Sequence, residues 1–208
     1  MLWLLEELGC EYQLVKYQRD PHTLLAPPEL RRIHPLGKSP VITDGARVIA
    51  ESGAIIEYLL DTLGNGRLRP ATGSEARLRY TYWLHYAEGS AMPPLLLKLV
   101  FQRLPKGPVP ALLRPIVRSL AARAQASFID PQLQTHIAWW ESELTRHPWF
   151  AGEEFTAADI QMSFPLEAAA ARSGMAMGEK VRGFLERIHL RSAYQRALAA
   201  GGKFRLPA

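Results

Sequence analysis

The stretch His34-Pro35-Leu36-Gly37-Lys38-Ser39-Pro40-Val41-Ile42 decides the fold of this 208-residue chain. A short apolar strand begins at Ser39-Pro40, although proline lacks the N–H that a strand ladder uses and therefore belongs at a strand start or an edge. A cis Ser39–Pro40 bond would turn the N–H and C=O of the preceding residue outward. The stretch thus predicts a sheet edge that pairs with the extended backbone of a peptide ligand.

A second stretch, Ala50-Glu51-Ser52-Gly53-Ala54-Ile55-Ile56-Glu57-Tyr58-Leu59, opens an amphipathic helix. The free N–H groups and the dipole at its start favour a bound carboxylate. The Glu51 side chain beside them offers the opposite charge and favours a cation. Together the two stretches predict a ligand that carries a carboxylate and an ammonium group on one carbon, attached to a short peptide.

These stretches resemble the glutathione-site signature of the soluble glutathione S-transferases. The resemblance covers nearly the whole chain, and a subfamily from yeasts and bacteria is similar in Tyr17-Gln18-Arg19-Asp20, Ala26-Pro27-Pro28-Glu29-Leu30, Tyr86-Ala87-Glu88-Gly89-Ser90 and Ala158-Asp159-Ile160-Gln161-Met162-Ser163-Phe164-Pro165-Leu166. It implies that glutathione, as co-substrate, is bound by Lys38, Ser39, Pro40, Glu51 and Ser52, with Lys38 reaching the glycyl carboxylate.

The resemblance also implies a small electrophilic substrate. His85 and Tyr86 are expected to line its pocket, on a helix over residues 74–90. It further implies a homodimer in which the helix that begins near Ser74 faces the partner subunit.

The order of elements predicts an α/β plus all-α architecture. Residues 1–66 are expected to form a thioredoxin-like, glutathione-binding domain that lacks its first strand, and residues 74–208 an all-helical C-terminal domain. In the first domain we expect a helix stopped by Gly9, a strand over 12–17, a short helix over 29–33, a hairpin around Asp44-Gly45 and a helix over 52–63. In the second we expect helices over 74–90, 93–127 (broken by prolines), 130–146, 157–172 and 178–200. A capping box at Thr156 and Asp159 is expected to open the helix over 157–172.

The first helix has no capping residue before it, so the chain is expected to start within an element through a misplaced start or an incomplete record. In the resembled family, a central strand precedes the first helix. The Ser, Tyr, Thr or Cys that activates the glutathione thiol also lies before that helix. The catalytic residue is therefore unknown, and the segment 12–17 is expected to lack a strand neighbour.

Composition excludes several classes of function. Hydrophobic residues make up 48% and charged residues 22%, as in an ordinary soluble globular protein. The net charge of +5 comes from dispersed basic residues without an interleaved aromatic cluster, which argues against a nucleic-acid site. The single cysteine, Cys10, is expected to be a packed side chain in a reducing compartment. The six histidines show no metal-ligand spacing, and no apolar run reaches membrane-spanning length, so we predict no metal, no membrane span and a cytoplasmic location.

Three functions remain open from the sequence. The first is conjugation of glutathione to an electrophile by thiolate attack, and the second is glutathione-dependent disulfide reduction. The third is a non-catalytic interaction protein with the transferase fold. The complete set of charged and hydroxyl groups from Lys38 to Ser52 argues against the third, because a scaffold needs no clamp for a zwitterion.

Overall fold

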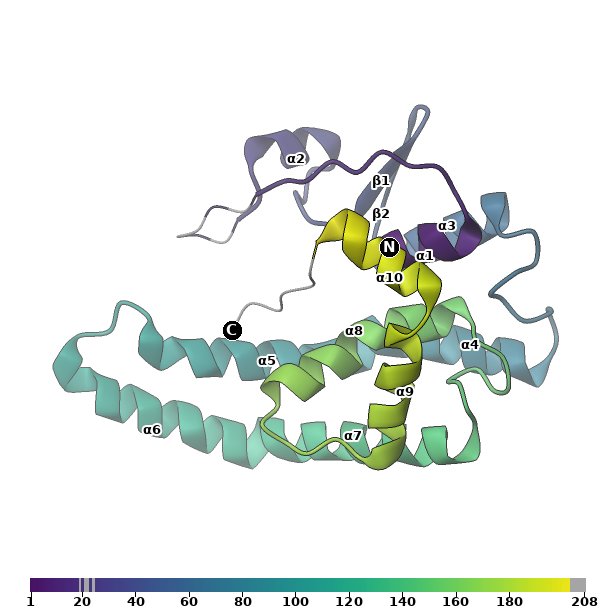
Figure 1. The fold of residues 1–208 in the computed structure, drawn as a ribbon. Helices are drawn as coiled ribbons and strands as arrows, with labels where there is room; N and C mark the ends of the chain where they lie inside the picture. The colour runs from purple at the N-terminus through teal and green to yellow at the C-terminus, as the bar shows by residue number, and fades with distance from the viewer. Residues whose placement is uncertain (19, 21–22, 24, 203–208) are drawn as a thin grey trace. The chain divides into compact units, whose positions relative to one another are not determined.

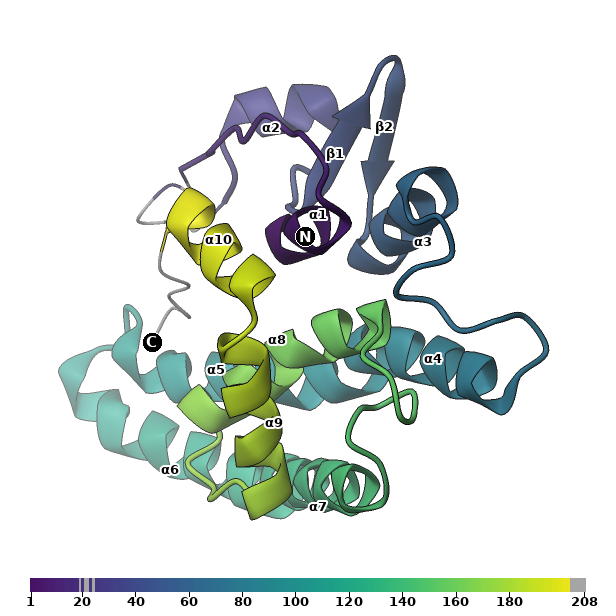
Figure 2. The ribbon, with the colours of Figure 1, turned by 45° about the vertical axis from the view of Figure 1, so that its right-hand side comes forward.

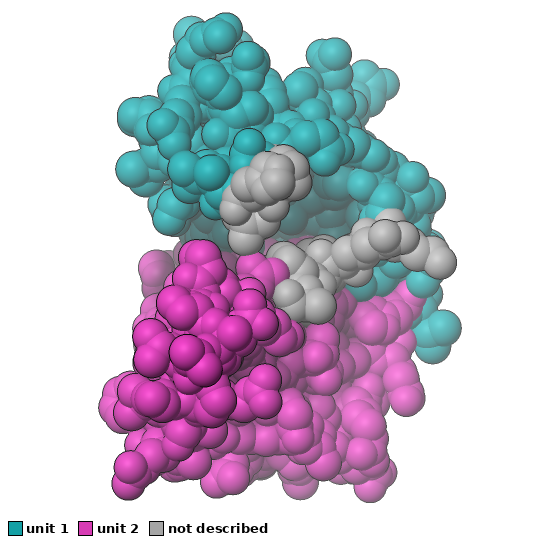
Figure 3. Space-filling view, turned by 90° about the vertical axis from the view of Figure 1, so that its left-hand side faces the viewer, with its two compact units in different colours: residues 1–71, 190–204 teal, residues 72–189, 205–208 magenta. Residues whose placement is uncertain are grey.

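The computed structural model describes residues 1–18, 20, 23 and 25–202, and Arg19 of the motif at 17–20 lies outside them. The chain divides into two compact units (Figures 1 and 3). Among the described residues, the first unit contains 1–71 and 190–202. Its elements are α1 (Leu2–Leu8), α2 (Pro28–Ile33), β1 (Val41–Asp44), β2 (Arg47–Ala50), α3 (Ser52–Leu63) and α10 (Ser192–Gly201).

The second unit runs from Thr72 to His189 and is helical throughout its described elements. They are α4 (Glu75–Tyr86), the π-helix η1 (Ala87–Ala91), α5 (Met92–Arg103), the short 3₁₀ turns η2 (Leu104–Lys106) and η3 (Ala111–Leu113), α6 (Arg114–Ala124), the π-helix η4 (Gln125–Ile129), α7 (Asp130–Arg146), α8 (Ala157–Arg172) and α9 (Glu179–His189). The grouping of α10 with the first unit is a feature of the structure, and the expected domain ranges of 1–66 and 74–208 stay predictions.

The hairpin forms where the sequence predicts it. Strands β1 and β2 pair antiparallel in a register that sets Val41 opposite Ala50 and Asp44 opposite Arg47. The two-residue loop between them begins with Gly45 at φ 55°, a left-handed conformation that glycine adopts without a side-chain clash. Helix α3 follows directly and buries Ile55, Ile56, Leu59 and Leu60 on one face.

The expected strand over residues 12–17 does not form. Among the residues that the structure describes, the sheet consists of β1 and β2 alone, and residues 12–17 belong to no helix or strand, in agreement with the expected absence of a strand neighbour. Most of their side chains are exposed. An extended segment becomes a strand only when a neighbour takes its backbone hydrogen bonds, so alternation of side chains in the sequence was not sufficient.

The expected single helix over 178–200 is also wrong, because it is broken at Leu190 and Arg191 into α9 and α10. Helix α10 lies beside α1 in both ribbon views (Figures 1 and 2). Arg191 adopts an extended conformation at φ −67°, ψ 132° and holds the Glu7 carboxylate of α1 through Nε at 2.6 Å and Nη2 at 2.9 Å. Trp3 and Tyr194 pack edge to face between the same two helices. These contacts hold α10 against α1, and the extended backbone of Arg191 separates α10 from the helix before it.

Two π turns interrupt the long helices of the second unit, where the sequence predicts plain breaks. Pro93 follows η1 and Pro131 follows η4 within two residues, and proline removes one N–H from the regular i to i−4 pattern. The expected helix over 130–146 is confirmed as α7, although the π turn η4 joins it to α6 where the sequence predicts a gap after residue 127. The core of this unit is aromatic, with Tyr80, Trp83, Trp140, Phe150 and Phe184 almost fully buried.

Candidate functional site

The hairpin register brings the two sequence stretches together. Because Val41 pairs with Ala50, the residues just outside that pair, Pro40 and Glu51, leave the same end of the hairpin. The Ser39–Pro40 peptide bond is cis, as expected. The end of the hairpin thus brings Pro40 and Glu51 to one place, with Lys38 and Ser39 directly before Pro40 and Ser52 directly after Glu51 in the chain.

The approach to this edge depends on a glycine. Gly37 has φ 55°, and its N–H donates to the His34 carbonyl oxygen at 2.8 Å. A Cβ atom at Gly37 would lie 2.6 Å from Cγ of Arg31, well inside van der Waals contact. A residue with a side chain would therefore be strained by the positive φ and would force either the Arg31 side chain or the turn before Lys38 to shift.

Glu51 has an unusual backbone. Its φ is 71° and its ψ is 126°, a conformation that costs a non-glycine residue of order 1–3 kcal/mol. Its carbonyl oxygen accepts from Ile55 N–H at 2.9 Å and starts α3, while no side chain caps the helix. Such strain persists where the surroundings enforce it, and it marks Glu51 as a constrained position at the helix entrance.

The side chains at the hairpin end are available to a ligand. Lys38, Ser39 and Glu51 are exposed and Ser52 is half-buried, and within the described residues none of the four has a side-chain hydrogen bond or ion pair. The first N–H groups of the 12-residue helix α3 point out of its start. One cation, one anion, two hydroxyls and a row of amide donors match a zwitterionic peptide.

His85 and Tyr86, the expected pocket residues, lie on α4 but differ in environment. His85 is exposed, whereas Tyr86 is buried in the second unit. The Tyr86 hydroxyl oxygen accepts from Nε1 of Trp140 at 3.1 Å, and the hydroxyl group also contacts Nδ1 of His136. Because the indole can only donate, the Tyr86 O–H is left free to donate to an acceptor such as a neutral histidine nitrogen.

Burial explains the electrostatics of this group. It raises the pKa of Tyr86 and lowers the pKa of His136, so both side chains stay neutral near pH 7. His136 and Trp140 were not predicted from the sequence, although their spacing of four residues places them on one helix face. The assignment of His85 and Tyr86 to an electrophile pocket stays a prediction.

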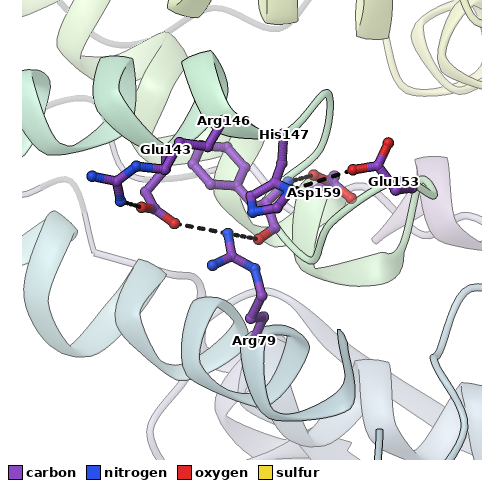
Figure 4. Close-up of polar contacts among 7 residues, drawn as sticks. Arg79, Glu143, Arg146, His147, Glu153 and Asp159 are labelled. Carbon is purple, nitrogen blue, oxygen red and sulfur yellow. Dashed lines mark hydrogen bonds and ion pairs between the residues drawn. The ribbon is translucent and has the colours of Figure 1, made fainter. Parts of the chain in front are cut away.

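A second polar cluster, shown in Figure 4, has a structural role. The buried Glu143 carboxylate accepts from Arg79 Nη2 and from Arg146 Nη1, both at 2.7 Å. The capping box is confirmed, since the Asp159 carboxylate accepts from the N–H and the hydroxyl of Thr156 at 2.8 and 3.0 Å. No cluster of potential metal ligands occurs in the described part of the chain.

Two cavities lie away from the hairpin end. One is lined by Gln18, Thr23, Arg31 and neighbouring residues before and within α2, and the other by Phe101, Arg118 and neighbours on α5 and α6. Neither wall includes Lys38, Glu51 or Ser52. The candidate site is therefore described by its residues at the hairpin end, of which Lys38, Ser39 and Glu51 are exposed. Nor is any helix in the described ranges both long and apolar enough to cross a membrane.

Known proteins share the fold and the sequence. The family model for the glutathione S-transferase N-terminal domain matches residues 1–61. Glutathione S-transferase 1 of Saccharomyces cerevisiae is 31% identical over 179 residues, which cover 83% of this chain and 76% of the relative. Glutathione S-transferase 3 of Schizosaccharomyces pombe is 34% identical over 170 residues, covering 81% and 69%.

Solved structures agree. A glutathione S-transferase from Actinobacillus pleuropneumoniae matches with a TM-score of 0.79 and 34% identity, covering 96% of this chain and 85% of that one. A sphingomonad glutathione S-transferase complexed with glutathione shares the fold at a TM-score of 0.72 and 22% identity, covering 98% and 92%. The fold is thus a thioredoxin-like N-terminal domain with few strands followed by an all-helical C-terminal domain. The chain belongs to the glutathione S-transferase family.

Proposed function

We propose that this chain binds glutathione at the end of its hairpin and presents the thiol of glutathione to a small electrophilic carbon. The juxtaposition of Pro40 and Glu51 by the hairpin register carries the proposal. It brings the backbone at Pro40 and the start of α3 to one place. The first can pair with the backbone of a short peptide, and the second can bind the carboxylate of its zwitterionic end.

Each residue has a role in the proposed complex. The Glu51 carboxylate pairs with the ammonium group of the γ-glutamyl residue. The Ser52 hydroxyl and the N–H groups at the start of α3 donate to the carboxylate on the same carbon. Ser39 and Pro40 form the edge along which the peptide lies, and Lys38 pairs with the glycyl carboxylate. A sphingomonad glutathione S-transferase of the same fold is complexed with glutathione, which supports glutathione as the ligand.

The chemistry proposed for the bound tripeptide is thiolate attack. Binding holds the sulfur and the electrophile together and so replaces a bimolecular encounter with a reaction at fixed geometry. A hydrogen-bond donor next to the sulfur would lower the thiol pKa and raise the thiolate fraction. We assign that donor to none of the residues at the hairpin end. The single cysteine and the need for reduced glutathione support a cytoplasmic location.

Two measurements on the unmodified chain test the proposal. Titration calorimetry with glutathione should give saturable binding with one site per chain. A spectrophotometric assay should then show conjugation of glutathione to a chlorinated aromatic electrophile. Absence of binding heat would contradict the site. If the chain binds glutathione and reduces a glutathione mixed disulfide but does not conjugate, the proposed activity changes from conjugation to disulfide reduction. Binding without either reaction would favour an interaction protein.

We further propose that the chain forms a homodimer through α4. This helix exposes two large side chains one turn apart, with Leu78 65% and Tyr82 47% accessible. Residues four apart lie on one helix face, so the two form a continuous apolar stripe. An apolar stripe on a folded surface is typical of a protein interface.

A further inference from the structure

Arg172, in the last turn of α8, holds an unused pair of donors. Its Nε and Nη2 atoms are buried and form no hydrogen bond within the described structure. These two nitrogens lie on one edge of the planar guanidinium group, where their N–H bonds point side by side. A buried donor without an acceptor costs about 1–3 kcal/mol, and more when it is charged, so this edge is expected to have a partner in the working protein.

The same edge is occupied in another arginine of this protein. Arg191 uses its Nε and Nη2 to hold both oxygens of the Glu7 carboxylate, at 2.6 and 2.9 Å. Arg191 therefore shows which kind of ligand this pair of donors binds, namely an anion with two oxygens side by side. No described carboxylate occupies the corresponding edge of Arg172.

The surroundings of Arg172 add positive charge. Nε2 of Gln102 donates to the Arg172 carbonyl oxygen at 3.2 Å, which holds the end of α5 against the end of α8. Arg103 follows Gln102 on α5, and its charge acts on Arg172. Burial and then the charge of Arg103 lower the pKa of Arg172. Because the two like charges repel each other, an anion bound beside Arg172 would relieve that repulsion. The dipole at the end of α8 favours a cation there, but it supplies no acceptor for the buried N–H groups.

We propose that Arg172, with Arg103 beside it, forms a binding site for a small oxyanion that presents two oxygens to one guanidinium edge, either a carboxylate or a phosphate. The ligand must be small or must end in such a group, because the two donor nitrogens are buried. Arg172, Arg103 and the supporting Gln102 all belong to the helical unit, and none belongs to the hairpin end. The proposal therefore stands or falls independently of glutathione binding.

The test uses the full chain with inorganic phosphate and with acetate, each compared with chloride at constant ionic strength. The side-chain Nε–H resonance of Arg172, assigned through bonds, should shift and saturate with at least one of the two anions. The anion that produces the shift names the ligand class. No saturable shift with either anion overturns the proposal.

Two variants sharpen the test. Arg172→Lys keeps the charge but loses the paired N–H groups, so the affinity for the anion should fall about tenfold. Arg123→Lys, at an exposed position of α6, is the matched control and should leave the affinity unchanged. Equal affinities for all three proteins would show that the anion binds elsewhere and would contradict the proposal. Circular dichroism checks that each variant is folded, and the resonance titration of the unmodified chain decides the question if Arg172→Lys does not fold.

Discussion

Arg79 and Asp159 hold the two polar groups of one backbone residue, Phe150. Nη2 of Arg79 donates to the Phe150 carbonyl oxygen at 3.1 Å, and Oδ1 of Asp159 accepts from the Phe150 N–H at 2.8 Å (Figure 4). Phe150 itself is fully buried and packs against Trp83 at 4.6 Å between ring centroids. Side chains from α4 and α8 therefore fix the loop between α7 and α8 and the aromatic core beneath it.

Asp159 should make stability depend on pH. Burial raises the pKa of its carboxyl group from 3.8 to about 6. Between these values the folded chain keeps a proton that the unfolded chain has released, so the free energy of unfolding falls as pH rises. We expect a loss of about 1–3 kcal/mol across this window, relative to Asp159→Asn, which cannot titrate. Urea unfolding of both proteins at several pH values measures the difference. Identical pH profiles would contradict the assignment.

Glu141 and Gly178 should be coupled in stability. The Glu141 carboxylate on α7 accepts from the N–H groups of Lys180 and Val181 at 2.9 and 3.0 Å and so caps the start of α9. A Cβ atom at Gly178 would lie 2.1 Å from that carboxylate. Glu141→Ala should cost about 1 kcal/mol as a lost cap. Gly178→Ala should also destabilise the protein, because it displaces the carboxylate.

A double-mutant cycle measures this coupling. Once Glu141 is alanine, the methyl group at Gly178→Ala has no carboxylate to displace. The double variant should therefore be less destabilised than the sum of the two single variants, by at least about 0.5 kcal/mol. Denaturant unfolding of the four proteins gives the four free energies. Strict additivity would show that the carboxylate and the added methyl group do not interact.

Leu78→Arg should dissociate the proposed homodimer. The change places a charge in the apolar stripe formed with Tyr82 on α4, where the partner would have to desolvate it. Light scattering at micromolar concentration should give a mass near twice 23.3 kDa for the unmodified chain and near 23.3 kDa for the variant. Leu112→Arg, at a leucine that is 92% exposed outside α4, serves as the control and should stay dimeric. A monomeric unmodified chain would refute the dimer.

Local signals were enough to predict much of the fold. Gly9 ends α1 in a left-handed conformation at φ 68°, and the Asp44-Gly45 pair marks the hairpin loop. Thr156 and Asp159 open α8 as a capping box. Each of these signals depends only on residues within a few positions of one another. It can therefore be recognised in a single sequence.

The missed features depend on distant residues. The break at Arg191 exists because Arg191 meets Glu7, 184 positions earlier. The segment over 12–17 has the side-chain pattern of a strand, and the expected absence of a neighbouring backbone explains why it forms none. In the candidate site, the stretches over 34–42 and 50–59 meet because a hairpin joins them. The Asp44-Gly45 pair was enough to predict that hairpin. The positive φ of Glu51 had no sequence signal, because glutamate rarely adopts it. The unused donors of Arg172 likewise appear only in the packed structure.

Calorimetric titration of glutathione into variants at the end of the hairpin tests the central claim most directly. Glu51→Gln removes the charge but keeps the size of the side chain, and Ser52→Ala removes one hydroxyl. Glu29→Ala, at an exposed carboxylate on α2 with a long surface ion pair to Arg32, is the matched control. Each site variant should lose about 1.5–3 kcal/mol of binding free energy, or roughly ten- to hundredfold in affinity, while the control binds normally. An unchanged affinity in the Glu51→Gln, Ser52→Ala double variant would contradict the account.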